Sequence, residues 1–301
     1  MFNQMQTLEW LIEDTNDNVR YLTAKNILNM PQCSLRTLKI KLKSDSIYKE
    51  VTQKQKEDGS VGHGNVWDGT PSTLLLLVQR GFDISDPKIH KVCRHVLQYQ
   101  DKNYRWVAIL GQSSEEITHC YGVDSFLLKT LLLAGFPPLD IRIRKSFAKV
   151  VKQQSKDGGW GKGCKKFEPN QSCPYKTLQV IQALHLVRFP QYEAKLKQGV
   201  LFLNNYLKEK SHHELNYLIL NKLELHIFIT IAVEILSKSE LKWAENWAMS
   251  CYNERYFEPP ILPKDKLTSR PDYIRNNLTK EFFTYYLTYF MLKMQKNKNT
   301  S

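Results

Sequence analysis

The sequence has little glycine and proline, no block of like charge and no long apolar run. Its 301 residues include 13 Gly and 12 Pro, which cluster at a few points and leave long helix-compatible stretches between them. With 42% apolar residues, the composition excludes a disordered or fibrous chain. The apolar run "LHIFITIAVEIL" is too short to span a bilayer and contains Glu234. We therefore expect a folded protein without a transmembrane segment, and "MFNQMQTLEW" predicts no signal peptide.

Basic residues outnumber acidic ones, but they form no cluster. The formal net charge is +13, from 43 Lys and Arg against 30 Asp and Glu. No run of five or more like charges occurs, and the chain has no zinc-finger spacing, RNP motif or clear helix-turn-helix. We therefore expect a solvated basic surface and no nucleic-acid partner, while peripheral contact with an anionic membrane stays open.

The six cysteines include no CxxC pair, which argues against a standard zinc or redox motif. Cys164 and Cys173 flank a lysine-rich loop and are nine residues apart. With His119, Cys120 or Asp157 they offer a weak mixed zinc site, and free thiols are the favoured interpretation. The sequence therefore requires no cofactor, leaves zinc or magnesium open, and predicts reduced thiols in a cytoplasmic protein.

One short motif recurs along the chain. It reads Gln-x3-Gly-x-Trp from Gln154 to Trp160, partial copies begin at Gln55 and Gln100, and a degenerate copy ends at Phe257. A spacing of about 45 to 55 residues is typical of a helix-pair repeat.

Each copy lies between two different helical patterns. An amphipathic segment such as "IRIRKSFAKVVKQQ" precedes it, and a uniformly apolar segment such as "CPYKTLQVIQALHLV" follows it. A helix with one apolar stripe is peripheral and a helix that is apolar all round is buried, so each repeat predicts one outer and one inner helix. Gly81 and Gly135 are placed to end inner helices, and Asp17 is placed to cap the segment "DNVRYLTAKNIL".

The repeats predict an all-α fold. Six inner helices that run in the same direction can close into an (α/α)6 toroid. Closure is favoured because the last segment, "EFFTYYLTYFMLKM", is as apolar as the middle ones, whereas an open solenoid needs polar caps. We expect a HEAT-like N-terminal helical hairpin at residues 1–45, the toroid repeats at 46–295 and a disordered basic tail at 296–301.

The motif resembles the QW repeat of squalene and hopene cyclases. The helical pattern, from about Ser46 to Met294, is similar to the α/α toroid superfamily of terpene cyclases and protein prenyltransferase β subunits. The resemblance implies that the glutamine ties one helix to the next, that Trp106 and Trp160 are packing residues, and that a central cavity holds an isoprenoid. The sequence departs from the superfamily in lacking both the DxDD motif of class II cyclases and the Asp-x-Cys of prenyltransferase zinc sites.

Polar residues just before the inner helices are the candidate catalytic residues. The N-termini of these helices would ring one mouth of a toroid, where they favour anions. In "EEITHCYGVDS", Asp124 or Glu116 is a candidate buried acid with His119 as its partner, and in "VWDGTPST", Asp68 is a second candidate carboxylate. Helix capping is the competing interpretation for Asp124, His119 and Asp68.

The candidate ligand-binding residues are aromatic or basic. Trp67 and Tyr121 lie beside the acidic segments, Tyr175 and Lys176 open a later inner helix, and Tyr285 lies in the last one. A lysine can hold a diphosphate, and aromatic rings can line an isoprenoid chain or face a carbocation. An ordinary surface lysine and ordinary core packing are the alternatives.

These features favour a prenyltransferase-like or terpene cyclase-like protein. It would bind an isoprenoid or another hydrophobic ligand in a central cavity and catalyse prenyl transfer or cyclisation. The alternative is a non-catalytic helical-repeat scaffold that retains the toroid fold, which the absence of both catalytic motifs supports.

Overall fold

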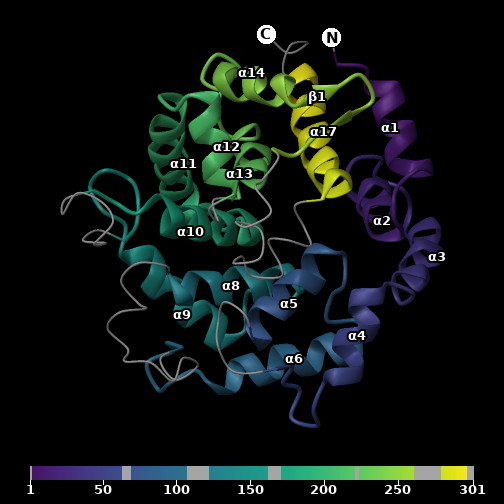
Figure 1. The fold of residues 1–301 in the computed structure, drawn as a ribbon. Coiled ribbons are helices and arrows are strands. Elements are labelled where there is room, and N and C mark those ends of the chain that lie inside the picture. Colours follow the sequence, from purple (N-terminus) through teal and green to yellow (C-terminus); the bar gives the residue numbers. More distant parts are fainter. Residues whose placement is uncertain are drawn as a thin grey trace. The chain divides into compact units, whose positions relative to one another are not determined.

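The computed structural model describes residues 2–62, 69–106, 122–161, 171–220, 224–260 and 279–296. These residues are mostly helical, as predicted, with one short two-stranded ribbon (Figure 1). The chain divides into two compact units. Residues 52–78 and 82–209 form the central unit, and residues 1–51, 79–81 and 210–301 form the terminal unit.

The central unit alternates two kinds of helix. α5 (Thr70–Gln79, its last residue in the terminal unit), α8 (Val123–Leu133) and α10 (Pro174–Val187) are apolar and largely buried. α6 (Pro87–Gln98), α9 (Ile141–Lys152) and α11 (Glu193–Lys208) bury one face each, and a 3-10 turn, η1 (Pro190–Tyr192), leads into α11. α10 packs against α8 and α11, and α8 packs against α9 (Figure 1). The buried helices are those that the sequence marks as apolar all round.

Side-chain chemistry fixes the helix ends. The Asp86 carboxylate accepts the Lys88 backbone N–H at 2.8 Å where α6 begins, and Asp140 accepts the Arg142 N–H at 2.9 Å where α9 begins. Gly135 follows α8 with a φ of 85°. This left-handed conformation suits glycine at a helix C-terminus, as predicted for this position.

The terminal unit gathers both ends of the chain. Its helices are α1 (Gln4–Glu13), α2 (Asp17–Asn26), α3 (Gln32–Leu42), α4 (Ser46–Lys54, which runs on into the central unit), α12 (His212–Leu220), α13 (Leu225–Ala232), α14 (Lys242–Ser250) and α17 (Lys280–Lys296). α17 packs against α1, α2, α13 and α14 (Figure 1). β1 (Tyr252–Asn253) pairs antiparallel with β2 (Tyr256–Phe257), so the degenerate motif copy forms a short hairpin.

One predicted cap in the terminal unit is wrong. Asn16, not Asp17, caps α2, because the Asn16 side chain accepts the Val19 N–H at 3.1 Å and Asp17 is already the first helical residue. An acidic residue at that place still favours the helix through the helix dipole. Within the ranges described above, no helix combines the length and the apolarity that crossing a bilayer requires.

Candidate functional site

Three loops of the central unit share one hydrogen-bonding pattern, which we call the joint. In each, the side-chain amide of a glutamine donates to two backbone carbonyls. The first carbonyl lies four residues further on and the second in the first turn of the next amphipathic helix. The pairs are Gln55 with Gly59 (3.4 Å) and Lys88 (3.0 Å), Gln100 with Tyr104 (3.2 Å) and Arg142 (3.4 Å), and Gln154 with Gly158 (2.8 Å) and Lys195 (2.9 Å).

The backbone of the joint turns the same way each time. The residue four after the glutamine has a positive φ: 93° at Gly59, 59° at Tyr104 and 87° at Gly158. Glycine adopts this conformation without strain, whereas tyrosine does so at a cost. Tyr104 therefore keeps the turn although the sequence there no longer marks it.

The two motif tryptophans are packing residues. Trp106 and Trp160 are buried. The indole N–H of each donates to the carbonyl of the residue ten earlier, Val96 at 3.0 Å and Val150 at 3.1 Å, in the amphipathic helix before the loop. A buried indole needs such a partner for its N–H, so these side chains anchor the loop to the preceding helix.

The last residue of the motif is also tied to the buried helix that follows. Its backbone N–H donates to a side-chain oxygen within the first five residues of that helix. The pairs are Val61 with Thr70 (3.0 Å), Trp106 with Asp124 (3.1 Å), Trp160 with Thr177 (2.9 Å) and, in the terminal unit, Phe257 with Thr284 (3.0 Å). The acceptor is a threonine hydroxyl in three of these four pairs and the Asp124 carboxylate in the fourth.

The joint at Asp124 differs in its electrostatics. One Asp124 oxygen accepts the Trp106 N–H, and the other accepts the Arg105 Nε–H at 3.2 Å in an ion pair. Both oxygens are therefore acceptors, as in a carboxylate, and neither is placed as a proton donor. Helix capping, one of the two interpretations of Asp124, describes this geometry.

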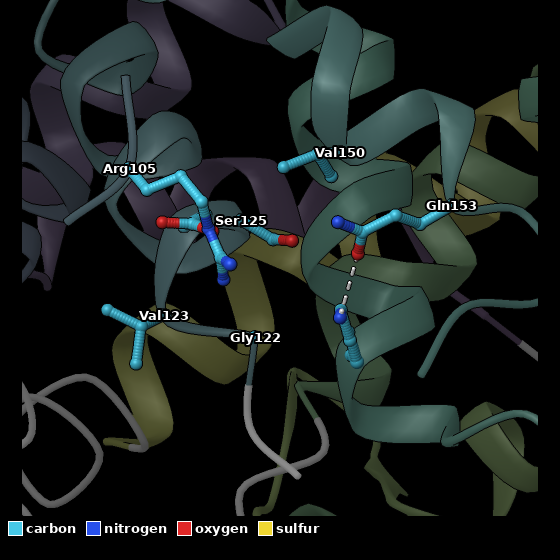
Figure 2. A pocket seen from close by; sticks show the side chains of 8 residues that line it. Arg105, Gly122, Val123, Ser125, Val150 and Gln153 are labelled. Atoms are coloured by element: carbon cyan, nitrogen blue, oxygen red, sulfur yellow. Dashed lines mark hydrogen bonds and ion pairs between the residues drawn. The ribbon is translucent and has the colours of Figure 1, made fainter. Parts of the chain in front are cut away.

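A small cleft opens beside Asp124. It is lined by Arg105, Gly122, Val123, Asp124, Ser125, Val150, Gln153 and Lys176, and it encloses about 10 Å³ (Figure 2). The Lys176 ammonium donates to the Gln153 side-chain oxygen at 3.3 Å. Burial lowers the pKa of Lys176, the nearby Asp124 raises it and Arg105 lowers it, and the net pKa is below the ordinary lysine value. Among the described residues, the cleft thus holds two cationic side chains and one carboxylate.

The structure brings two of the predicted site residues together. Asp124 and Lys176 line the same cleft, whereas Tyr175, next to Lys176, does not line it. Arg105, Ser125 and Gln153 also line it, and the sequence did not single them out. The remaining candidates lie outside the described residues and stay predictions: Trp67, Asp68, Glu116, His119, Tyr121 and Cys164.

Tyr285 is a core residue of the terminal unit. Its hydroxyl oxygen accepts a hydrogen bond from the Asn26 side chain at 2.7 Å, and burial raises its pKa to about 12. Cys173 is buried. In the part of the chain that the structure describes, no cluster of three or more His, Cys, Asp or Glu residues is arranged to hold a metal ion.

A second buried polar group lies in the terminal unit. The Gln79 amide donates to the Glu224 carboxylate at 2.9 Å, just before α13. The His226 ring lies 5.0 Å from the Tyr286 ring, centre to centre. Burial raises the pKa of Tyr286, and the nearby Tyr285 and Glu224 add to that effect. The His226 ring thus packs against α17, to which Tyr286 belongs and whose Phe282 and Phe283 are wholly buried.

Comparison with known proteins gives one partial similarity. No family model matches the chain. A stretch of 137 residues is 28% identical to the squalene–hopene cyclase of Zymomonas mobilis, covering 43% of this chain and 20% of that protein. The chain therefore matches about a fifth of the length of this relative. The similarity suggests a terpene cyclase-like superfamily, in agreement with the resemblance carried by the motif.

Proposed function

We propose that this chain is a divergent α/α toroid of the terpene cyclase and prenyltransferase type that binds an isoprenoid or another hydrophobic ligand in a central cavity. The observation that carries the proposal is the similarity to squalene–hopene cyclase over 137 residues. The three joints support it, because they repeat one geometry at the spacing expected of a helix-pair array. A hairpin at residues 1–45 and toroid repeats at 46–295 belong to the same proposal.

The proposed reaction is prenyl transfer or cyclisation. Either one passes through an electron-deficient carbon centre, which aromatic rings stabilise. The Asp124 carboxylate is held as an acceptor in its joint, so Asp68, Glu116 and His119 are the better candidates for moving a proton. A carboxyl group in this role needs a place in the cavity wall where a weakly hydrated environment keeps its acid form available.

The first test is the identity of small molecules that co-purify with the native protein. The protein is extracted with organic solvent, and the extract is analysed by mass spectrometry beside an extract of the same sample after denaturation and washing. An isoprenoid in roughly equimolar amount in the native sample alone supports the proposal. The protein is then incubated with squalene and with farnesyl diphosphate, and the products are followed over time. If neither compound binds or reacts and no lipid co-purifies, the proposal is wrong.

The second candidate function is a non-catalytic helical-repeat scaffold. It is favoured by the one candidate acid that the structure describes, since Asp124 performs the task that threonine performs in the other three joints. A scaffold would carry no lipid and would be inert toward both compounds. It would also be retained by a protein partner in cell extract, which cross-linking and mass spectrometry would identify.

A further inference from the structure

In the part of the chain that the structure describes, the cleft beside Asp124 is lined by more positive than negative side chains. Arg105 and Lys176 face it with one carboxylate, that of Asp124. Arg105 uses its Nε–H for Asp124, and among the described residues its two terminal nitrogens have no hydrogen-bond partner. Within the described ranges, the Lys176 ammonium donates to the neutral Gln153 side chain alone, at 3.3 Å. After Arg105 has paired with Asp124, its terminal nitrogens and the Lys176 ammonium still have no anionic partner among the residues that the structure describes.

Ser125 adds an unused donor. Its side chain is fully buried, and in the described part of the chain its Oγ has no hydrogen-bond partner. A buried hydroxyl without a partner costs about 1–3 kcal/mol, so such groups are uncommon in folded proteins. Ser125 lines the cleft, and in Figure 2 its hydroxyl points toward the space that Val150 and Gln153 border on the other side.

The cleft also receives a helix N-terminus. α8 is eleven residues long, and no side chain of the described residues caps its first turn, since Gly122 occupies the N-cap position with a φ of 64°. The unpaired first-turn N–H groups and the helix dipole both favour an anion. This first turn forms one wall of the cleft, which is lined there by Gly122, Val123, Asp124 and Ser125.

We propose that this cleft binds a phosphate group, held by Lys176, Arg105, the Ser125 hydroxyl and the first-turn N–H groups of α8. Each of these groups donates hydrogen bonds, and a phosphate oxygen accepts several at once. The anion also stabilises the charged form of Lys176, whose pKa is lowered by burial and by Arg105. The Asp124 carboxylate stays engaged with Trp106 and Arg105 and does not turn toward the ligand.

The size of the cleft sets how the ligand enters. The enclosed volume of about 10 Å³ admits one oxygen-sized atom. One terminal phosphate oxygen therefore occupies the cleft, and the rest of the group lies at its opening, where Lys176 releases Gln153 to reach it. A free phosphate and the diphosphate of a lipid offer the same oxygen. The proposal does not depend on the proposed isoprenoid function, because inorganic pyrophosphate has no hydrocarbon part.

Isothermal titration calorimetry of the full chain with inorganic pyrophosphate tests the site. Lys176→Gln should weaken binding at least about tenfold, as expected for a lost charge-assisted hydrogen bond. Ser125→Ala removes only an atom that has no partner, so the protein should stay folded while binding weakens about threefold or more. Lys152→Gln is the matched control, because Lys152 is exposed at the end of α9, does not line the cleft and carries the same charge. It should change affinity less than about twofold.

Three outcomes overturn the proposal. Pyrophosphate does not bind; or Lys152→Gln weakens binding as much as Lys176→Gln, which means nonspecific attraction to a basic surface; or Ser125→Ala binds like wild type, which means that a single water satisfies the serine. Titrations with farnesyl diphosphate and with farnesol, which has no phosphate, show whether the bound phosphate belongs to a lipid or to a free anion. Tighter binding of the diphosphate ester than of pyrophosphate, with the same loss in Lys176→Gln, supports a lipid-borne group. Equal binding of the two supports a free anion.

Discussion

The Asp124 carboxylate accepts the Trp106 backbone N–H at 3.1 Å, in the position where the Thr177 hydroxyl accepts the Trp160 N–H at 2.9 Å. The Thr177 hydroxyl also donates back to the Trp160 carbonyl, at 3.4 Å. A carboxylate has no proton to donate, and Asp124 instead uses its second oxygen for Arg105. The repeat thus accepts either a threonine or an aspartate at this position. Of the two, only the aspartate pairs with a cation, which is Arg105 beside the cleft.

Replacement of Asp124 should separate its structural task from a catalytic one. Asp124→Thr keeps an acceptor for the Trp106 N–H, so the free energy of unfolding should stay within about 1 kcal/mol of wild type. Asp124→Leu leaves that N–H unpaired and should cost about 1–3 kcal/mol. Urea denaturation measures both. Both variants lose the ion pair with Arg105 equally. Equal destabilisation by the two substitutions would show that the hydrogen bond to Trp106 does not matter.

Gln154 should be a stabilising residue although it is not fully buried. Its amide makes two hydrogen bonds, at 2.8 Å and 2.9 Å, that connect the loop to the start of α11. Gln154→Ala should therefore cost about 1–3 kcal/mol and speed amide exchange in the first turn of α11. Gln153→Ala is the control, since Gln153 is exposed and, among the described residues, its side chain bonds only to Lys176. It should change stability by less than about 0.5 kcal/mol. If the two variants behaved alike, the joint would not stabilise the fold.

Periodicity predicted the helices because burial leaves a regular mark on sequence. The uniformly apolar segment that becomes α10 is buried, and the segment that becomes α9 buries one face. The hydrogen-bond partner of the glutamine was harder to predict from the sequence. Gln154 bonds the carbonyl of Lys195, 41 residues away, and a backbone carbonyl has the same chemistry in every residue. The motif therefore predicts a joint without saying which helix it reaches.

The cleft was harder to predict than the joint. Arg105 occupies a variable position of the motif, and one more basic residue in a chain with 43 of them carries no information by itself. Tyr104 has a φ of 59°, and a tyrosine, unlike a glycine, does not indicate a positive φ in the sequence. Asp124 and Lys176 were recognisable because each lies in the first turn of an apolar helix. Their proximity depends on the packing of α8 against α10, and this tertiary contact cannot be read from the sequence of either helix.

Gly158 should tolerate no side chain. A Cβ there would lie 2.8 Å from the Gln198 carbonyl oxygen, and its φ of 87° disfavours any L-residue. Gly158→Ala should cost about 2–4 kcal/mol, since strain and the clash add. Gly62→Ala is the matched control, because Gly62 has a φ of 70° and no atom of the described residues lies within 4 Å of its Cβ position. It should cost about 1–2 kcal/mol from strain alone, so thermal denaturation of the pair isolates the close approach of α11. Equal losses would mean that this approach does not constrain the turn.

Alkaline pH should destabilise the fold through Cys93. Burial raises the pKa of its thiol from 9.0 to about 12. Below pH 9 the thiol is protonated in both states, so the folded state bears no penalty. Above pH 9 the unfolded chain releases the proton that the folded chain keeps, and stability falls as pH rises toward 12 by up to ~1.4 kcal/mol per pH unit.

The test is urea denaturation between pH 8 and pH 10.5 of wild type, Cys93→Ala and Cys33→Ala. The Cys93→Ala variant should lose about 1 kcal/mol at pH 8, from the small cavity, but should fall less steeply above pH 9. Cys33 is exposed, so its thiol meets similar solvent in both states and its variant should keep the wild-type slope. Tyr285, with a pKa of about 12, contributes to the slope of all three proteins from its ordinary value of 10.0 upward and cancels in the comparison. Parallel slopes for wild type and Cys93→Ala would place the alkaline sensitivity in other groups and show that the thiol ionises as easily folded as unfolded.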